Sequence, residues 1–377
     1  MRRLYFSFFF VTLLFLTACG QPEITAQAVA EEPILLGANF PMTGRLSVYG
    51  QPLFEGFSLA VEEINNAGGI NGMQIELILE DNGGEPTRAV VAAQKLIESD
   101  KIRIQISTMV GPTGAIVPIT ESVKSVLLYA AASGEFAEQN KYVFKDSVDA
   151  KYDCEVLAKE AVNGGMRRIA LFGAIGEFTV DCKESIEKVL AKEGGELVKY
   201  EAYERGATDF RTPLIKIKAS EPDVIFLSTY ADDCLLIWRQ VKELNVRSPF
   251  MLPFTQTGCG EAKAMSEVKD SQLTITGLDF ISDAASKEYQ TYITNYRAKY
   301  GKEPSLPVFT MLAYDWAHYI AKALEQCPGA SDSECLKNAL EQTKHTGALG
   351  YVEYSTDHVA LRPRKLIEWK DGEWRGA

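Results

Sequence analysis

Two short segments of the sequence combine glycine, alanine or proline with a hydroxyl residue in a way that suits anion binding. They are Gly111-Pro112-Thr113-Gly114 and Ala131-Ala132-Ser133-Gly134, each directly after an apolar run. A helix N-terminus presents unpaired backbone N–H groups, and a neighbouring hydroxyl adds a donor, so both segments could hold a carboxylate. Thr113 and Ser133 could equally be ordinary helix caps, and the sequence leaves both interpretations open.

Catalysis and metal binding have little support among the residue types. The three histidines, His318, His345 and His358, fall in a predicted helix, near a turn and in the tail. None lies at the carboxyl end of a predicted strand, where a general base would act. The sequence has no Gly-x-Ser-x-Gly and no Cys-x-x-Cys, and Gly83-Gly84 lacks the lysine of a phosphate loop. We expect no enzyme activity, no cofactor and no metal.

The elements that position these segments alternate between strands and helices. Strands are expected at 34–40, 73–81, 102–109, 126–131, 142–147, 168–173, 197–203, 224–230, 250–254 and 274–280. Amphipathic helical patterns separate most of them, and such alternation predicts parallel β-α-β units covered on both faces. In open parallel sheets ligands bind beyond the carboxyl ends of the strands, where both segments fall.

The last hundred residues change character. Helices are expected at 285–300, 307–326 and 334–342, followed by strands at 349–354 and 365–369 and a hairpin turn at Asp371-Gly372. Helices alone cannot build a third α/β domain, so we expect them to complete the first lobe. The predicted fold class is therefore α/β with two discontinuous lobes: 34–148 plus 281–345, and 149–280 plus 346–377. A chain of 377 residues is long enough for two domains.

The N-terminus predicts export. Arg2 and Arg3 precede an uncharged apolar run that ends in Leu16-Thr17-Ala18-Cys19. This order is typical of a secretory signal, and the tetrad resembles a bacterial lipobox. We expect a signal peptide at 1–18, lipidation of Cys19 and a flexible tether at 19–33. The protein should then lie in the periplasm or at the cell surface, held to the membrane through its lipid alone.

Six cysteines remain beyond Cys19, an even number that suits disulfides in an exported protein. Cys327 and Cys335 bracket a turn-rich loop and are expected to pair. Cys154, Cys182, Cys234 and Cys259 allow three pairings, of which proximity favours Cys154–Cys182 and Cys234–Cys259. The net charge of −12 argues against a nucleic-acid partner.

The stretch from Ile34 to Asp81 resembles the leucine/isoleucine/valine-binding protein family of periplasmic receptors. The resemblance rests on Pro41-Met42-Thr43-Gly44, on Tyr49-Gly50 and on the helix end Ile64-Asn65-Asn66-Ala67-Gly68-Gly69-Ile70-Asn71-Gly72. Ala313-Tyr314-Asp315 and the hairpin tail extend it to nearly the whole mature chain. It implies a type I periplasmic-binding fold with three crossovers, no catalysis and delivery of a solute to a membrane permease.

The resemblance also implies binding residues. Tyr49 would line the ligand's side chain, Ala131 and Ser133 would hold its carboxylate, and Asp149 would lie near its amino group. Phe178 and Tyr230 would cover the ligand from the second lobe. Gly111 stands where many members have a serine, so Thr113 could replace that hydroxyl.

The main departure is Phe254, at a position where amino-acid-binding members tend to have a glutamate. A buried ammonium without an acid partner is costly, so either Asp149 or Asp233 serves alone or the ligand lacks an amino group. We expect a monomeric receptor for a small carboxylate, an amino acid or an aromatic or aliphatic acid, that serves an ABC permease. The alternative is an envelope lipoprotein of the same fold that acts as a sensor or as an activator of an enzyme.

Overall fold

The computed structural model describes residues 32–253, 259–260, 262–269, 271–280, 284–327, 329 and 332–376. The predicted signal peptide 1–18, Cys19 and all but the end of the predicted tether lie outside the described residues, and so does Phe254. Pro33–Ala377 forms one compact unit. Within the described ranges, each helix is too short or too polar to cross a bilayer.

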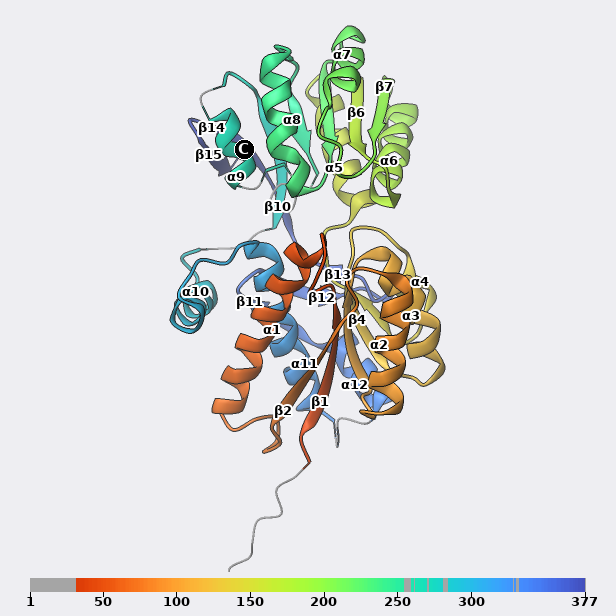
Figure 1. The fold of residues 1–377 in the computed structure, drawn as a ribbon, viewed down its shortest axis with the longest axis vertical. Coiled ribbons are helices and arrows are strands. Elements are labelled where there is room, and N and C mark those ends of the chain that lie inside the picture. The colour runs from red at the N-terminus through yellow and green to blue at the C-terminus, as the bar shows by residue number, and fades with distance from the viewer. Residues whose placement is uncertain are drawn as a thin grey trace, which may run out of the picture. The chain divides into compact units, whose positions relative to one another are not determined.

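The first lobe is built around a five-stranded parallel sheet (Figure 1). In spatial order its strands are β2 (Ile75–Asp81), β1 (Ile34–Phe40), β3 (Ile104–Thr108), β4 (Val126–Ala130) and β5 (Val143–Lys145). Its first helices are α1 (Ser47–Asn66), α2 (Pro86–Glu98), α3 (Val110–Ser122) and α4 (Phe136–Gln139). Strands β3 and β4 are buried along their whole length, which explains why both appear in the sequence as continuous rather than alternating apolar runs.

The second lobe contains a seven-stranded sheet in the order β15-β14-β10-β9-β8-β6-β7. Its parallel strands are β6 (Arg168–Ala174), β7 (Glu196–Tyr203), β8 (Val224–Ser228), β9 (Phe250–Leu252) and β10 (Ile275–Phe280). Its helices are α5 (Ala150–Asn163), α6 (Glu177–Glu193), α7 (Arg211–Ala219), α8 (Ala231–Glu243) and α9 (Ala262–Met265), followed by the 3-10 turn Ser266–Val268.

The antiparallel strands β14 (Arg364–Lys370) and β15 (Glu373–Gly376) add a hairpin to this sheet. Asp371 and Gly372 form the predicted turn with φ angles of 53° and 79°, the left-handed region that such a two-residue turn requires. The hairpin is therefore confirmed.

Three C-terminal helices share the hydrophobic core of the first-lobe strands: α10 (Lys287–Tyr300), α11 (Pro307–Leu324) and α12 (Ser333–Gln342). Helix α11 lies against α1 so closely that a Cβ at Gly56 would be 2.0 Å from the Thr310 carbonyl oxygen. A small antiparallel sheet follows, made of β11 (Lys344–Gly347), β12 (Gly350–Tyr354) and β13 (Ala360–Leu361).

The segment between 346 and 361, which we assigned to the second lobe, packs elsewhere. Leu349, Val352 and Tyr354 belong to the same hydrophobic core as the strands of the first lobe. Strand β14, by contrast, pairs with β10 in the second lobe. We therefore propose that the last crossover lies at 362–363, with the first lobe formed by 34–148 plus 281–361.

Buried ion pairs connect the chain where it passes between the lobes. The Arg362 guanidinium donates from Nε and Nη2 to the two carboxylate oxygens of Asp146, over 2.7 and 2.8 Å. Its Nη1 lies 3.6 Å from Asp315, whose carboxylate accepts the backbone N–H groups of Ala348 and Leu349. These contacts join the first crossing, after β5, to the last one, before β14.

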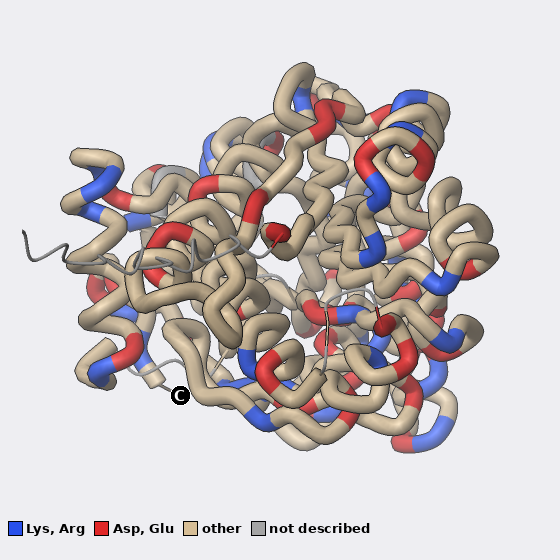
Figure 2. Tube along the Cα trace, turned by 90° about the horizontal axis from the view of Figure 1, so that it is seen from below, with Lys and Arg blue, Asp and Glu red and all other residues tan. Residues whose placement is uncertain are grey.

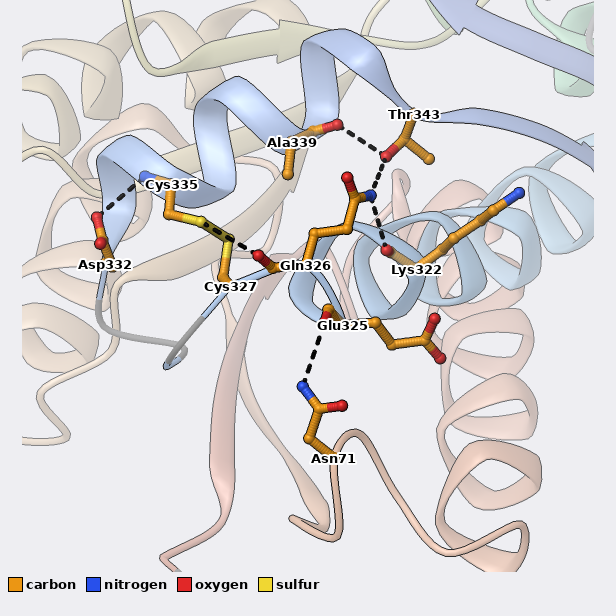
Figure 3. The surroundings of a disulfide bond; sticks show 9 residues. All are labelled: Asn71, Lys322, Glu325, Gln326, Cys327, Asp332, Cys335, Ala339 and Thr343. Atoms are coloured by element: carbon orange, nitrogen blue, oxygen red, sulfur yellow. Dashed lines mark hydrogen bonds between the residues drawn. A yellow bond between two sulfur atoms is a disulfide. The ribbon is translucent and has the colours of Figure 1, made fainter.

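Three disulfides cross-link the described chain: Cys154–Cys182, Cys234–Cys259 and Cys327–Cys335. The pairings are the ones that chain proximity favoured. Figure 3 shows the third disulfide between the end of α11 and the start of α12, where the Asp332 carboxylate caps α12 by accepting the Cys335 N–H. Acidic and basic residues interleave along the trace (Figure 2).

Candidate functional site

A cavity of about 400 Å³ lies at the carboxyl ends of the parallel strands, and both lobes contribute to it. The first lobe supplies residues after β1, β2, β3, β4 and β5 and one residue of α11, and the second lobe supplies residues after β6, β7 and β8. Its walls are formed by Leu46, Tyr49, Gly84, Pro86, Met109, Val110, Gly111, Pro112, Ala130, Ala131, Ala132, Ser147, Val148, Gly176, Glu177, Phe178, Arg205, Thr229, Tyr230 and Phe309.

The loop after β1 is held in place by a single carboxylate. Asp81, the last residue of β2, accepts hydrogen bonds from the backbone N–H groups of Met42, Thr43 and Gly83 and from the Thr43 hydroxyl. Burial alone would raise the pKa of Asp81, but these donors lower it to about 2. The loop leads into α1 and so positions Tyr49, which is 3% exposed, at the cavity.

The start of α3 offers backbone donors to the cavity. Met109 precedes the helix with a φ of 70°, a left-handed conformation uncommon for such a side chain, and none of the described side chains caps the helix. Val110 and Gly111 therefore present the N–H groups of the first turn beside the cavity. The Thr113 hydroxyl bonds instead to Ser107 on β3, 3.0 Å away, and Thr113 is absent from the described lining.

The loop after β4 presents backbone rather than hydroxyl. Ala131 and Ala132 line the cavity, and the Ala132 carbonyl accepts the Ala150 N–H at the start of α5. Ser133 is 2% exposed and is not one of the lining residues. Within the described part of the chain its hydroxyl meets no hydrogen-bond partner.

Asp149 has two structural partners. Its Oδ1 accepts the Tyr152 N–H and so caps α5, while its Oδ2 lies 2.7 Å from the Lys145 ammonium. Burial would raise the pKa of Asp149, but Lys145 and the capping bond hold it below its ordinary value. Asp149 is not part of the described lining, so its expected contact with an amino group remains a prediction without support from the geometry.

Aromatic rings form a continuous wall that both lobes share. Tyr230 makes edge contacts with Phe178 at 5.4 Å and with Tyr49 of the first lobe at 6.5 Å between ring centroids. Tyr49 in turn makes an edge contact with Phe309 at 5.4 Å. The predicted site residues Tyr49, Gly111, Ala131, Phe178 and Tyr230 thus come together, whereas Thr113, Ser133 and Asp149 do not reach the lining.

Sequence reasoning missed several lining residues, among them Glu177, Arg205, Thr229 and Phe309. Arg205 follows β7 by two residues, and its guanidinium carbon lies 3.9 Å from the centroid of the Tyr230 ring. The rule that ligands bind beyond the carboxyl ends of strands would have found Arg205 and Thr229 had it been applied to the second lobe. No sequence signal marks Phe309, which enters from the distant helix α11.

Comparison with known proteins identifies the family. A family model described as periplasmic binding protein matches residues 33–373. The chain belongs to the periplasmic binding protein family. Its leucine/isoleucine/valine-binding branch includes a Leu/Ile/Val-binding protein, BraC3, of Rhizobium johnstonii, which is 26% identical over 96% of this chain and 99% of its own.

Solved structures of solute-binding proteins of ABC transporters have the same fold. The branched-chain amino acid substrate-binding protein LivJ from Streptococcus pneumoniae, in complex with isoleucine, has a TM-score of 0.77 and 24% identity, covering 91% of this chain and 98% of its own. A solute-binding protein of an ABC transporter from R. palustris, in complex with benzoate, has a TM-score of 0.80 and 18% identity, covering 91% and 95%.

Membership of this family makes the chain a solute-binding protein and not an enzyme. Its histidines have structural surroundings: His358 stacks on Phe144 at 4.4 Å, and His345 stacks on His318 at 6.3 Å. Burial lowers the pKa of His345 to about 4. Among the residues described, no cluster of three or more histidine, cysteine or acidic side chains could hold a metal ion.

In this periplasmic binding protein the second disulfide lies directly behind the cavity. The Thr229 hydroxyl lies 2.8 Å from Cys259 Sγ and 3.0 Å from Cys234 Sγ, while Thr229 itself lines the cavity. The Trp238 indole N–H donates to the Cys259 carbonyl. The disulfide therefore ties the cavity residues after β8 to the segment after β9.

Proposed function

We propose that this protein is an extracytoplasmic solute-binding lipoprotein that captures a small carboxylate-bearing solute and delivers it to an ABC importer. The observation that carries the proposal is the cavity itself. It lies at the carboxyl ends of strands from both lobes and combines an aromatic wall with the uncapped N-terminus of α3. Such a site is concave, mainly apolar and furnished with a few oriented donors, as small-molecule sites usually are.

The donors favour an acid. The N–H groups of Val110 and Gly111 lie at the positive end of a helix dipole and suit a carboxylate oxygen. The rings of Tyr49, Phe178, Tyr230 and Phe309 suit an apolar or aromatic body. An amino acid and an aromatic or aliphatic acid both remain within the proposal. The two relatives in complex with isoleucine and with benzoate each bind a carboxylate of one of these kinds.

Ligand contact with both lobes explains how binding could signal to a permease. A ligand that touches both walls of the cavity binds more tightly when the walls approach, so it shifts the population toward a closed arrangement. A permease that recognises this arrangement would receive loaded protein in preference to empty protein. The alternative, a lipoprotein with a degenerate cleft, fits less well with a cavity of about 400 Å³.

The anchor is the second part of the proposal. Cys19 follows an apolar signal and would carry the lipid, with 19–33 as a tether. Lipid labelling of cells that express the wild-type chain should place label on the protein. Cys19→Ala should remove the label, and release of unlabelled wild-type protein into the soluble fraction would contradict the anchor.

Ligand binding is tested on the purified chain that starts after Cys19. A thermal-shift panel should contain branched-chain and aromatic amino acids, benzoate and hydroxybenzoates, and short aliphatic acids. A ligand that binds the folded protein and not the unfolded chain raises the melting temperature. At a ligand concentration 100 times its Kd, the folded state gains about 2.7 kcal/mol of stability. Absence of any shift across the panel would contradict the receptor function and favour the alternative lipoprotein.

A further inference from the structure

We propose that Arg205 recognises the carboxylate of the ligand from the second lobe. The inference rests on the proposed function and deepens it, because it assigns the acid group of the solute to a particular side chain. The resemblance to the family assigns that role to the loop around Ala131 and Ser133. The geometry points instead to a guanidinium on the opposite wall.

Arg205 is placed for this role by its position in the fold. It lies in the loop between β7 and α7, at the same edge of the sheet as Phe178 and Tyr230. Its guanidinium lies over the Tyr230 ring at 3.9 Å, and that ring contacts both Phe178 and Tyr49. The guanidinium therefore packs against the aromatic wall that both lobes share. This contact with the ring restricts the motion of the guanidinium, whose planar fork can offer two parallel N–H groups to a carboxylate.

The surroundings strengthen the attraction between this cation and an anion. Among the lining residues that the structure describes, Arg205 alone carries a positive charge, and most of its neighbours are apolar. An ion pair is stronger beside apolar walls than in bulk water because the local dielectric is lower. Glu177, the acidic residue of the described lining, is exposed to solvent, where its charge is screened.

The first-lobe loops cannot supply an equivalent group. The Ser133 hydroxyl lies outside the lining, and Thr113 directs its hydroxyl to Ser107. Besides the uncharged hydroxyl residues Tyr49 and Ser147, what this wall offers is backbone, namely the N–H groups at the start of α3. A planar guanidinium binds a carboxylate with two charge-assisted hydrogen bonds, which are roughly twice as strong as neutral ones. Arg205 therefore dominates recognition of the acid.

The test compares acids with their amides on matched variants. Isothermal titration measures benzoate against benzamide and leucine against leucinamide, on the wild type, Arg205→Met, Arg205→Lys and Arg211→Met. Arg211 begins α7 nearby, is exposed and pairs with Asp209 and Glu243, so it serves as the control. Thermal melting without ligand checks that each variant is folded.

The wild type should bind at least one acid tightly and its amide weakly. Arg205→Met should weaken binding of that acid about 10- to 100-fold, the range of a charge-assisted hydrogen bond, and leave the amide unchanged. The affinity of Arg205→Lys for the acid should lie between those of the wild type and Arg205→Met, because lysine keeps the charge and loses the planar fork. Arg211→Met should match the wild type.

The two proposals fail in different ways. If the wild type binds an acid and Arg205→Met binds it equally well, the assignment of Arg205 is wrong and the receptor function stands. Preference for an amide over its acid in the wild type would also overturn the assignment. If the wild type binds none of the four compounds and none of the wider panel, the receptor function itself fails.

Discussion

Replacement of Arg362 should reveal how much the crossing segments depend on their buried charges. Arg362 is 6% exposed and Asp146 is 1% exposed, and two hydrogen bonds of 2.7 and 2.8 Å join them. In Arg362→Met the side chain keeps its apolar stem, but Asp146 retains the Trp316 indole N–H as its remaining side-chain donor among the described residues. Asp315, 3.6 Å from the guanidinium, loses its cation as well.

The expected loss follows from the burial of these groups. Removal of one partner from a buried pair costs about 3–5 kcal/mol, because the other charge stays in the protein without compensation. With an unfolding entropy of about 2 cal/mol/K per residue over the body Pro33–Ala377, this corresponds to a fall in melting temperature of roughly 4–7 °C. Differential scanning calorimetry on the unliganded protein measures the change.

Arg375→Met provides the matched control. Arg375 pairs with Asp371 at 3.0 Å, but the two side chains are 51% and 78% exposed, so its loss should cost at most about 1 kcal/mol. Asp146→Asn, added to Arg362→Met, should recover part of the stability because it removes the orphaned charge. The reasoning is refuted if Arg362→Met has the same melting temperature as Arg375→Met, or if adding Asp146→Asn to Arg362→Met lowers the melting temperature further.

Three further predictions follow from packing, titration and cross-linking. Gly56→Ala should lower stability by about 1–3 kcal/mol in urea unfolding, because its Cβ would lie 2.0 Å from the Thr310 carbonyl oxygen; Gly376→Ala, with open space around it, should be neutral. The pKa of about 2 at Asp81 lies below its unfolded value, so its stabilisation is present above pH ~4 and disappears as the pH falls toward 2; Asp81→Asn should flatten an acid-unfolding curve in that window. Replacing both cysteines of Cys234–Cys259 by serine should lower the stability by about 3.5 kcal/mol, and the same change at Cys327–Cys335 by about 2.5 kcal/mol, because the loops they close span 25 and 8 residues. The first change should also weaken ligand binding in the titration assay, because Thr229 contacts both sulfurs, whereas the second should leave the affinity unchanged.

Much of the fold was predictable because its signals are local. Apolar runs alternating with amphipathic segments predicted the parallel strands, and Asp371-Gly372 predicted the terminal hairpin. The assignment of 346–361 to the second lobe followed from chain order alone. The short strands β11 to β13 carry no signal of which core they join, and that is decided by the packing of Leu349 and Val352.

The site was predictable only where a resemblance or a strand end marked it. Tyr49, Phe178 and Tyr230 came from the resemblance and do form the wall. Ser133 matched by position, but it is buried and does not line the cavity, because a residue's position in the chain does not determine where its hydroxyl points. The partners Asp146 and Arg362 are 216 residues apart in the sequence, so neither carries a local sign of the other.

The crossing after β5 links the ion pairs to the cavity. Ser147 and Val148 line the cavity. The residue before them, Asp146, forms an ion pair with Arg362, and the residue after them, Asp149, forms an ion pair with Lys145 and accepts an N–H from the first turn of α5. The Ser147 carbonyl also accepts a hydrogen bond from Arg364, whose guanidinium carbon lies 3.7 Å from the centroid of the Phe280 ring. Buried ion pairs are weak evidence for stability, since apolar groups of the same volume often stabilise a protein as well. Here they restrict geometry: a guanidinium that donates two hydrogen bonds fixes the orientation of the crossing segment after β5, and so the position of the cavity wall, more tightly than apolar packing would.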